Sequence, residues 1–177
     1  VAHDLNMKTV EVESVKNASK DFNNIVVGCI NSIEKHPNAD NLKVCEVYIG
    51  KATCDDLTEG KVQVVCGGSN LRVSMTVALA KVGAYVCWHG EGELVKLEKA
   101  KIRCVDSFGM ICASDEIGLG DMFFKSEEKE ILDLSLIGAA VGTPLASALG
   151  LEDAIYDIDN KSMTHRPDLW GHYGIAR

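Results

Sequence analysis

Three basic residues at alternate positions are the feature of this 177-residue chain with the clearest chemical consequence. Lys99, Lys101 and Arg103 are the odd-numbered positions in and just before residues 100–104, a segment that we expect to form a strand. Side chains alternate between the two faces of a strand, so these three would point the same way. The positions that we expect to face the core are Ala100, Ile102 and Cys104. A basic face suits a phosphate backbone, but an ordinary solvated strand face fits equally well, and both interpretations stay open.

Several polar residues extend this candidate surface. Lys96 and Lys81 would lengthen the basic patch, and the loop residues that could donate hydrogen bonds to phosphate or sugar are Asn38, Asn41, Ser69 and Asn70. Asn side chains in turns more often bond their own backbone, and Ser69 could cap the next turn, so we favour a structural role for them. Phe108 and Met110 lie in a stretch where an exposed aromatic side chain could stack on a base, but we expect both in the core. His36, before a proline, is interpreted as a surface or capping residue.

Other residue groups predict neither catalysis nor a metal site. His165, Asp168 and His172 have a suggestive spacing, but Pro167 interrupts the helix that would align them and no further ligand lies nearby. Asp115 and Glu116 are adjacent, but no further residue is expected to join them in a pair for general acid–base catalysis. The chain contains no P-loop, dinucleotide fingerprint, nucleophile elbow or zinc spacing. A hidden enzyme with a cysteine nucleophile is disfavoured because no histidine motif accompanies a cysteine.

Composition is that of a soluble globular protein, with 46% apolar and 25% charged residues. The seven cysteines form no C-x-x-C pair and mostly sit in strand-like segments, which favours reduced, structural thiols and a cytoplasmic setting. No secretory signal or membrane-length apolar run is present. The net charge of −8 is unfavourable for nucleic-acid binding, which must then be local, weak or dependent on a larger protein.

Short β-type segments separated by turn residues predict a mainly β fold, a small barrel or sandwich. The expected strands are 10–15, 25–30, 42–49, 61–66, 77–79, 84–87, 100–104, 131–134 and 154–159, with a turn or linker at 16–21, a short helix at 145–151 and another helix from residue 169. Changes in composition divide the chain into residues 1–24, 25–147 and 148–177. The last segment is too short to have a core of its own and belongs with another module.

Three motifs resemble a family of tRNA-binding domains found in phenylalanyl-tRNA synthetase β subunits, in methionyl-tRNA synthetases and as free-standing proteins. The motifs are His36-Pro37-Asn38-Ala39-Asp40-Asn41-Leu42, Gln63-Val64-Val65-Cys66-Gly67-Gly68-Ser69-Asn70-Leu71 and Ser107-Phe108-Gly109-Met110-Ile111-Cys112-Ala113-Ser114-Asp115-Glu116-Ile117-Gly118-Leu119. This resemblance implies an OB-type five-stranded barrel with short helices.

The tail is similar to the stretch that follows this domain in bacterial-type phenylalanyl β subunits. It contains Val141-Gly142-Thr143-Pro144-Leu145, Leu149-Gly150-Leu151-Glu152-Asp153, Thr164-His165-Arg166-Pro167-Asp168-Leu169 and Gly174-Ile175-Ala176-Arg177. His165 departs from the asparagine expected there. The absence of an initiator methionine and the abrupt end suggest a fragment, in which both chain ends form a small α+β flanking module around the barrel.

The resemblance implies an accessory role in attaching phenylalanine to tRNA, with tRNA and the α subunit of an (αβ)2 heterotetramer as partners and no DNA or membrane partner. The parent enzyme would use ATP and magnesium in the α subunit, whereas this segment would hold no cofactor and no catalytic centre. Two rivals stay open. One is a scaffold barrel with little RNA binding, favoured by 12 basic against 17 acidic residues in 25–147. The other is a free-standing tRNA-binding protein.

Overall fold

The computed structural model describes residues 1–8, 10–50, 60–90, 92–159, 161 and 164–176. Its contacts divide the chain into two compact units, one made of Val1–Ala18 with Glu152–Arg177 and the other of Ser19–Leu151. Arg177, the last residue of the predicted tail motif, lies outside the described residues. The domain boundaries predicted at residues 24 and 147 stay predictions.

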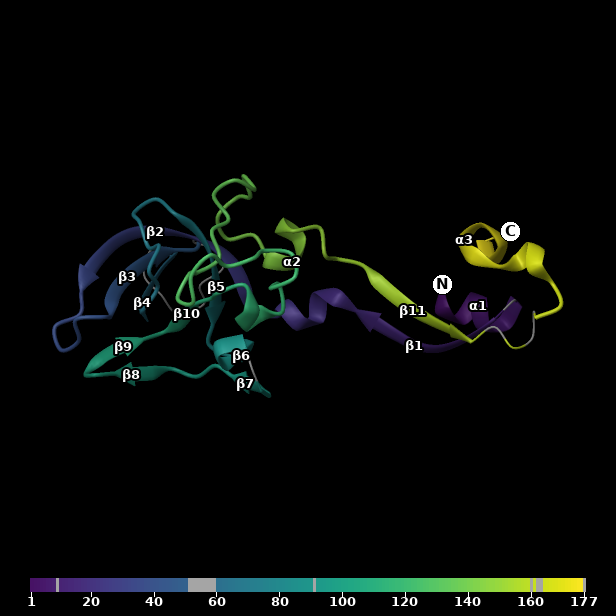
Figure 1. Ribbon diagram of the computed structural model, residues 1–177, viewed down its shortest axis with the longest axis horizontal. Helices are drawn as coiled ribbons and strands as arrows, with labels where there is room; N and C mark the ends of the chain where they lie inside the picture. Colours follow the sequence, from purple (N-terminus) through teal and green to yellow (C-terminus); the bar gives the residue numbers. More distant parts are fainter. Residues whose placement is uncertain (9, 51–59, 91, 160, 162–163, 177) are drawn as a thin grey trace. The chain divides into compact units, whose positions relative to one another are not determined.

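Five antiparallel strands form the sheet of the larger unit, in the order β10-β5-β2-β3-β4 (Figure 1). They are β2 (Ile25–Lys35), β3 (Lys43–Tyr48), β4 (Lys61–Cys66), β5 (Thr76–Lys81) and β10 (Gly109–Ile111). The two edges meet, because the Phe108 amide donates to the Gln63 carbonyl at 3.0 Å and the Val65 amide donates to the buried Ser107 hydroxyl at 3.1 Å. The sheet is a nearly closed barrel with short helices, which confirms the predicted mainly β, OB-type fold class.

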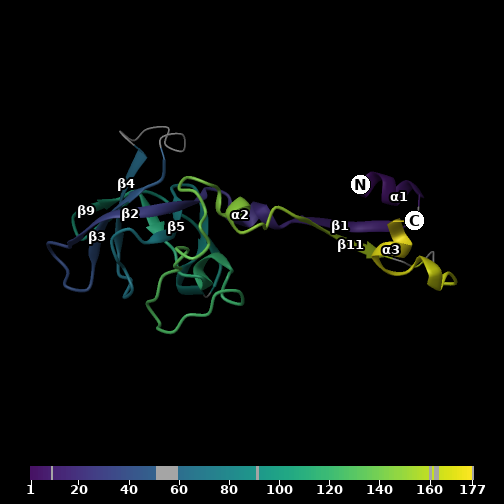
Figure 2. The same ribbon diagram turned by 90° about the horizontal axis from the view of Figure 1, so that it is seen from above.

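The longest strand, β2, runs through the middle of the sheet between β3 and β5 (Figure 2). The sequence predicted its start at Ile25 correctly but ended it five residues early, because its outer half is polar and pairs with β3 through the backbone. Gly28 lies where β2 packs closely against β3. A Cβ atom there would lie 2.6 Å from Val47 Cγ1. The register shifts between Ile30 and Ser32, which marks an irregularity in the strand.

Two apolar clusters occupy the larger unit. The cluster inside the barrel includes fully buried side chains from β2, β3, β4 and β5, such as Ile30, Val47, Val64 and Leu79. Each such side chain contributes about 1.5–3 kcal/mol when it leaves water. The second cluster joins other residues of β2 and β5 to the segments outside the barrel. One side chain that belongs to it is Leu145, at the start of α2 (Leu145–Ala148).

The long connection from β5 to β10 forms two hairpins. The first consists of β6 (Tyr85–Cys87), the 3₁₀ turn η4 (Trp88–Gly90) and β7 (Leu94–Lys96), and the second of β8 (Ala100–Ile102) and β9 (Val105–Ser107). After β10 come the 3₁₀ turn η5 (Asp115–Ile117) and an extended segment. The strand predicted at 131–134 is wrong, because within that range the described backbone makes only an isolated bridge, between Val77 and Asp133.

The smaller unit is a two-stranded antiparallel ribbon with short helices. It contains α1 (Ala2–Lys8), β1 (Glu11–Asn17), β11 (Ala154–Asp159), the 3₁₀ turn η7 (Pro167–Leu169) and α3 (Gly171–Ala176). The predicted strand 154–159 is confirmed. The linker predicted at 16–21 begins later, at the 3₁₀ turn η1 (Ala18–Phe22), because Lys16 and Asn17 still pair with β11. Among the described residues, no helix has the length and apolar character needed to cross a membrane.

Candidate nucleic-acid interface

At one end of the barrel, the turn between β2 and β3 is bonded to the tip of the β8–β9 hairpin. His36, only 5% exposed, accepts a hydrogen bond at Nδ1 from the Asn38 amide at 3.1 Å. The neutral ring then carries its hydrogen on Nε2, which donates to the Ile102 carbonyl at 3.1 Å. His36 therefore caps its turn as predicted, but it is a buried clamp between two loops and not a surface residue.

Two more hydrogen bonds link the same loops. Asn38 Nδ2 donates to the Arg103 carbonyl at 3.1 Å, and Arg103 Nη1 donates to the Asn38 carbonyl at 3.3 Å. The structure thus brings two predicted site residues together, from positions 65 residues apart. Both side chains are exposed, so each bond is weak by itself, but together with the His36 clamp they fix the hairpin tip against the turn.

The predicted strand face around Arg103 needs a correction. The strand β8 ends at Ile102, and Arg103 and Cys104 form a two-residue turn with φ of 44° and 76°. Such left-handed pairs are the tight turns that match the twist of a hairpin. Ala100 and Cys104 are exposed, not core-facing as predicted, because this hairpin lies outside the barrel and only one of its faces is partly covered.

An acidic side chain lies beside the predicted basic residues Lys99 and Lys101. Asp106 on β9 is the register partner of Lys101, and its carboxylate lies 4.0 Å from the Lys99 ammonium. Lys99 also lies 4.5 Å from the centre of the Phe108 ring, which packs against the barrel core as expected. Because the Lys99–Asp106 pair is about half exposed, it contributes at most about 1 kcal/mol, and the ammonium can exchange partners readily.

Sequence reasoning missed two lysines that flank the clamped turn. Lys35 ends β2 and Lys43 begins β3, and the two are directly opposite each other in the register. Like charges in this arrangement are destabilising unless an anion or counterion lies between them. The sequence feature that could have revealed these two lysines is their position directly before and directly after the His36–Leu42 motif. With Lys101 and Arg103, they add basic groups to the two loops that meet at this end.

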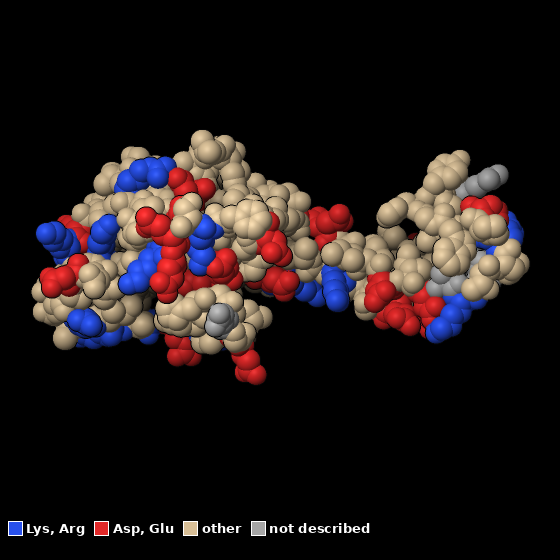
Figure 3. Space-filling view, in the orientation of Figure 1, with Lys and Arg blue, Asp and Glu red and all other residues tan. Residues whose placement is uncertain are grey.

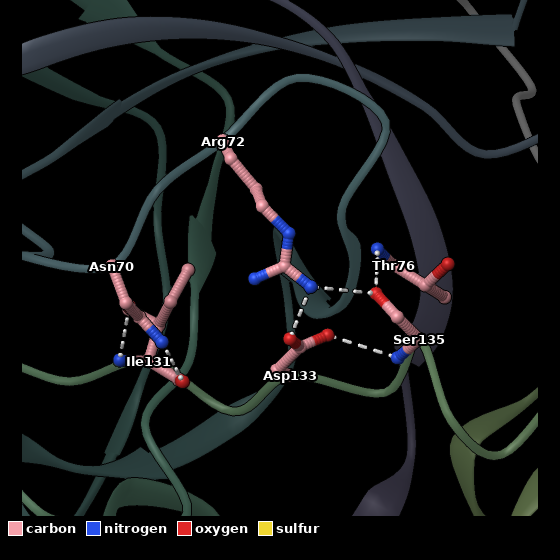
Figure 4. Close-up of polar contacts among 6 residues, drawn as sticks. All are labelled: Asn70, Arg72, Thr76, Ile131, Asp133 and Ser135. Carbon is pink, nitrogen blue, oxygen red and sulfur yellow. Dashed lines mark hydrogen bonds and ion pairs between the residues drawn. The ribbon is translucent and has the colours of Figure 1, made fainter.

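The remaining polar candidates have different surroundings. Asn70 exchanges two hydrogen bonds with Ile131, both 3.0 Å long (Figure 4). The Ser69 amide donates to the Lys129 carbonyl. This supports the structural interpretation of Asn70. By contrast, Asn41 is exposed and has no side-chain partner within the described ranges. Lys96 is exposed on β7, across from Tyr85. Their contacts with RNA stay predictions.

Near Asn70, an ion pair joins the same two chain segments. Arg72 donates to Asp133 at 2.6 Å, and the Ser135 hydroxyl accepts a hydrogen bond from the Thr76 amide at 3.2 Å (Figure 4). Burial alone would raise the pKa of Asp133. The hydrogen bonds from Ser135 and the Arg72 guanidinium outweigh burial and hold the pKa of Asp133 below its usual value. These contacts fasten the loop after β4 to the segment after β10.

Charge on the surface is mixed. Figure 3 shows blue and red side chains interspersed over the visible face of the barrel, without one continuous basic patch. This agrees with the overall charge of −8. Any contact with a polyanion at this end must therefore rely on a few local lysines and arginines. Their ion pairs with neighbouring acids are exposed to water and can be replaced by contacts with the polyanion.

Other ionisable side chains that could take part in chemistry already have partners within the structure. Lys125 pairs with Asp115, and Glu116 accepts the Ala113 amide at 2.7 Å while burial raises the Glu116 pKa. Arg166 forms a bidentate ion pair with Asp168, with both bonds at 2.8 Å. Within the described ranges, no cluster of His, Cys, Asp or Glu is arranged to hold a metal ion.

The described cysteines are all free. Burial, with a smaller contribution from Cys66, raises the pKa of Cys45 to about 12, and burial also raises the pKa values of the Cys66 and Cys112 thiols. Thiols with raised pKa values are poor nucleophiles because the thiolate is scarce at neutral pH. These three cysteines therefore act as small apolar core residues, as the sequence analysis expects.

The strand order, the nearly closed barrel and the two loops clamped at one end define an OB-type domain. This class presents loops at the mouth of the barrel to oligonucleotides or oligosaccharides. Residues 25–136 match the family described as "Putative tRNA binding domain", and the chain belongs to that family.

Full-length relatives extend the similarity over the whole chain. The phenylalanine–tRNA ligase beta subunit of Leptospira borgpetersenii is 37% identical over 94% of this chain and 19% of its own length. The subunit of the same name from Fusobacterium nucleatum is 34% identical over 100% of this chain and 20% of its own. The chain thus spans about one fifth of these relatives, and the resemblance to phenylalanyl β subunits is confirmed.

A solved structure, the C-terminal domain of Plasmodium vivax p43, is 22% identical over 50% of this chain and 44% of its own, with a TM-score of 0.35.

Proposed function

We propose that the larger unit binds tRNA through the clamped end of the barrel, formed by the β2–β3 turn and the tip of the β8–β9 hairpin. The observation that carries this proposal is the set of bonds from His36 and Asn38 to Ile102 and Arg103. In OB folds, the loop after the first strand and the loop between the last two strands are those that contact oligonucleotides. Here they are the two loops that the clamp joins.

The chemistry of this end suits a phosphate backbone. Lys101 and Arg103 are exposed on the hairpin, and Lys35 and Lys43 oppose each other beside the turn. Lysine and arginine side chains release counterions when they neutralise phosphates, which gives affinity without base specificity. The proposed contact therefore recognises the backbone and folded shape of tRNA and not its sequence.

Family membership and the named relatives support tRNA as the ligand. On this basis, we propose that the chain is part of a phenylalanine–tRNA ligase β subunit and has an accessory, non-catalytic role in the ATP- and magnesium-dependent attachment of phenylalanine to tRNA. The proposed partners are tRNA and an α subunit in an (αβ)2 heterotetramer, and the proposed location is the cytoplasm.

A second candidate function is that of a scaffold. Large apolar side chains are exposed on the loops after η5, among them Phe124 at 86% and Leu136 at 100%. Exposed apolar groups of this size often mark surfaces that pack against other protein segments. Together with the acidic balance, they favour a barrel that organises its neighbours and touches RNA little.

A tRNA titration of the chain at low salt separates the two functions. The test variant reverses the charges of the hairpin face, and the control reverses three exposed lysines elsewhere. The test variant is Lys99→Glu, Lys101→Glu and Arg103→Glu; the control is Lys8→Glu, Lys16→Glu and Lys20→Glu. Both change the net charge equally. We expect the test variant to lose affinity by on the order of 100-fold and the control to lose much less. Equal losses, or no binding by the native chain, would favour the scaffold.

A further inference from the structure

The β6–β7 hairpin presents an aromatic surface outside the clamped end of the barrel. Tyr85 on β6 is 50% exposed, and Trp88, which follows β6 directly, is 51% exposed. Leu94 on β7 is 65% exposed and lies opposite Cys87 in the register. Large aromatic side chains are usually covered in a folded domain, so two of them half exposed on one short hairpin mark a contact surface.

The inner face of this hairpin is anchored in the core. Ala84 and Val86 are fully buried, and Leu97 is 9% exposed. Backbone bonds close the base of the hairpin, because the Gly83 amide donates to the Leu97 carbonyl at 2.8 Å and the Leu97 amide to the Ala84 carbonyl at 2.7 Å. The base of the hairpin that carries the aromatic side chains is thus fixed to the core. A ligand that binds them orders little additional structure, which lowers the entropic cost of binding.

Basic residues accompany the aromatic ones. Lys96 is exposed and lies directly across β6–β7 from Tyr85. Residues 85–103, from the start of the first hairpin to the turn of the second, contain four basic side chains and three acidic ones, in a chain with a net charge of −8. Only three residues join β7 to β8, so the ends of the two hairpins lie within about 14 Å of each other. The connection from β5 to β10 therefore carries the two aromatic side chains on its first hairpin and the basic residues Lys101 and Arg103 on its second.

This combination distinguishes between two kinds of partner. Protein interfaces are enriched in aromatic residues but depleted of lysine, particularly at their centres. Surfaces for single-stranded nucleic acids combine lysines and arginines along the backbone with aromatic side chains on which bases stack. Lys96 beside Tyr85 fits the second kind.

We propose that the β6–β7 hairpin binds unpaired nucleotides of RNA, with bases stacked on Trp88 and Tyr85 and a phosphate beside Lys96. This inference rests on the proposed function, because it assigns the unpaired part of the same RNA to the first hairpin and its backbone to the second. Stacking of this kind tolerates any base, so the contact has little sequence preference.

Tryptophan fluorescence provides a direct test. The chain has two tryptophans, and Trp170→Phe leaves Trp88 as the only reporter. Titration of this variant with oligouridylate is expected to quench the Trp88 emission saturably, because a base stacks on the indole. In an anisotropy titration with labelled oligouridylate, Trp88→Ala and Tyr85→Ala should each weaken binding by about 5- to 150-fold. Trp88→Phe should retain most of the affinity. Trp88→Leu, apolar but without a ring, should lose as much as Trp88→Ala.

The outcomes separate this inference from the proposed function. Native binding of tRNA with no Trp88 quenching and with unchanged affinity in Trp88→Ala would overturn the inference and leave the proposed function intact. Native affinity in Trp88→Leu would also overturn it, because the contact would then be apolar packing. Failure of the native chain to bind either RNA at low salt would overturn both. Because Trp88 is half exposed, we expect each variant to unfold at the native temperature, as checked by circular dichroism.

Discussion

Replacing Asn70 with alanine should destabilise the larger unit strongly, although Asn70 lies in a loop. Its side-chain amide donates to the Ile131 carbonyl and accepts the Ile131 amide, both at 3.0 Å. Ile131 is 6% exposed, so the substitution leaves two backbone groups with little access to water. A buried group left unpaired costs about 1–3 kcal/mol, and partial solvation of the site recovers some of this. We therefore expect Asn70→Ala to lower the free energy of unfolding by about 2–4 kcal/mol.

The matched control for this prediction is Asn41→Ala. Asn41 is the same residue type in a nearby exposed turn and has no side-chain partner within the described ranges, so its loss should change stability by less than about 0.5 kcal/mol. Urea unfolding followed by the fluorescence of Trp88, which lies in the same unit, measures both variants in a Trp170→Phe background. In a thermal scan, the Asn70→Ala midpoint should fall by about 6–12 °C. Equal stability of the two variants would refute the structural interpretation of Asn70.

Three further predictions follow from contacts in the same unit. Arg72→Met should cost up to about 1 kcal/mol at neutral pH. Because the pKa of Asp133 is lowered in the folded state, this difference should be complete above about pH 4 and disappear as the pH falls through the lowered pKa, as urea titrations at several pH values would measure. Cys104, exposed at the hairpin tip, should react with a thiol reagent in the native state, whereas the buried Cys45 should react only on unfolding. Mass spectrometry after pulse labelling measures both, and fast labelling of Cys45 in the native state would contradict its burial. Gly109→Ala should destabilise the pairing of β10 with β5 by about 1–3 kcal/mol, because the added Cβ would lie 2.7 Å from a β5 carbonyl oxygen. An unchanged urea unfolding midpoint would show that the edge of the barrel can shift to accommodate the methyl group.

Much of the barrel could be predicted from short apolar and β-branched runs that end at turn residues. The bounds of β4 at Lys61–Cys66 agree with the prediction because the strand is rich in valine and two glycines follow it. The hairpin tip was predicted as strand because Arg103 and Cys104 lack the Asn-Gly or Gly-Gly signature of its turn type. The segment at 131–134 has a strand-like pattern, but the Asn70 side chain takes the backbone groups of Ile131 that a neighbouring strand would have used.

In the candidate site, spacing within one segment could be read from the sequence, whereas contacts between distant segments could not. The alternate spacing of Lys99 and Lys101 is a local property that can be read from the sequence. The approach of Asp106 to Lys99 depends on the returning strand of the hairpin. The clamp of His36 on Ile102 joins residues 66 positions apart and has no local signal. Long-range pairings of this kind depend on the closed barrel and not on any single segment.

We propose above that the clamped end of the barrel binds the tRNA backbone through a few local cations. The most direct test is the slope of log K for tRNA binding against log salt concentration, measured for the native chain and for a neutralised variant. That variant is Lys99→Gln, Lys101→Gln and Arg103→Gln. Each lost phosphate contact lowers the slope by about 0.7–0.9, so we predict a slope smaller by about 2–3 in the variant. An unchanged slope would contradict the account, because the hairpin would then displace no counterions from the RNA.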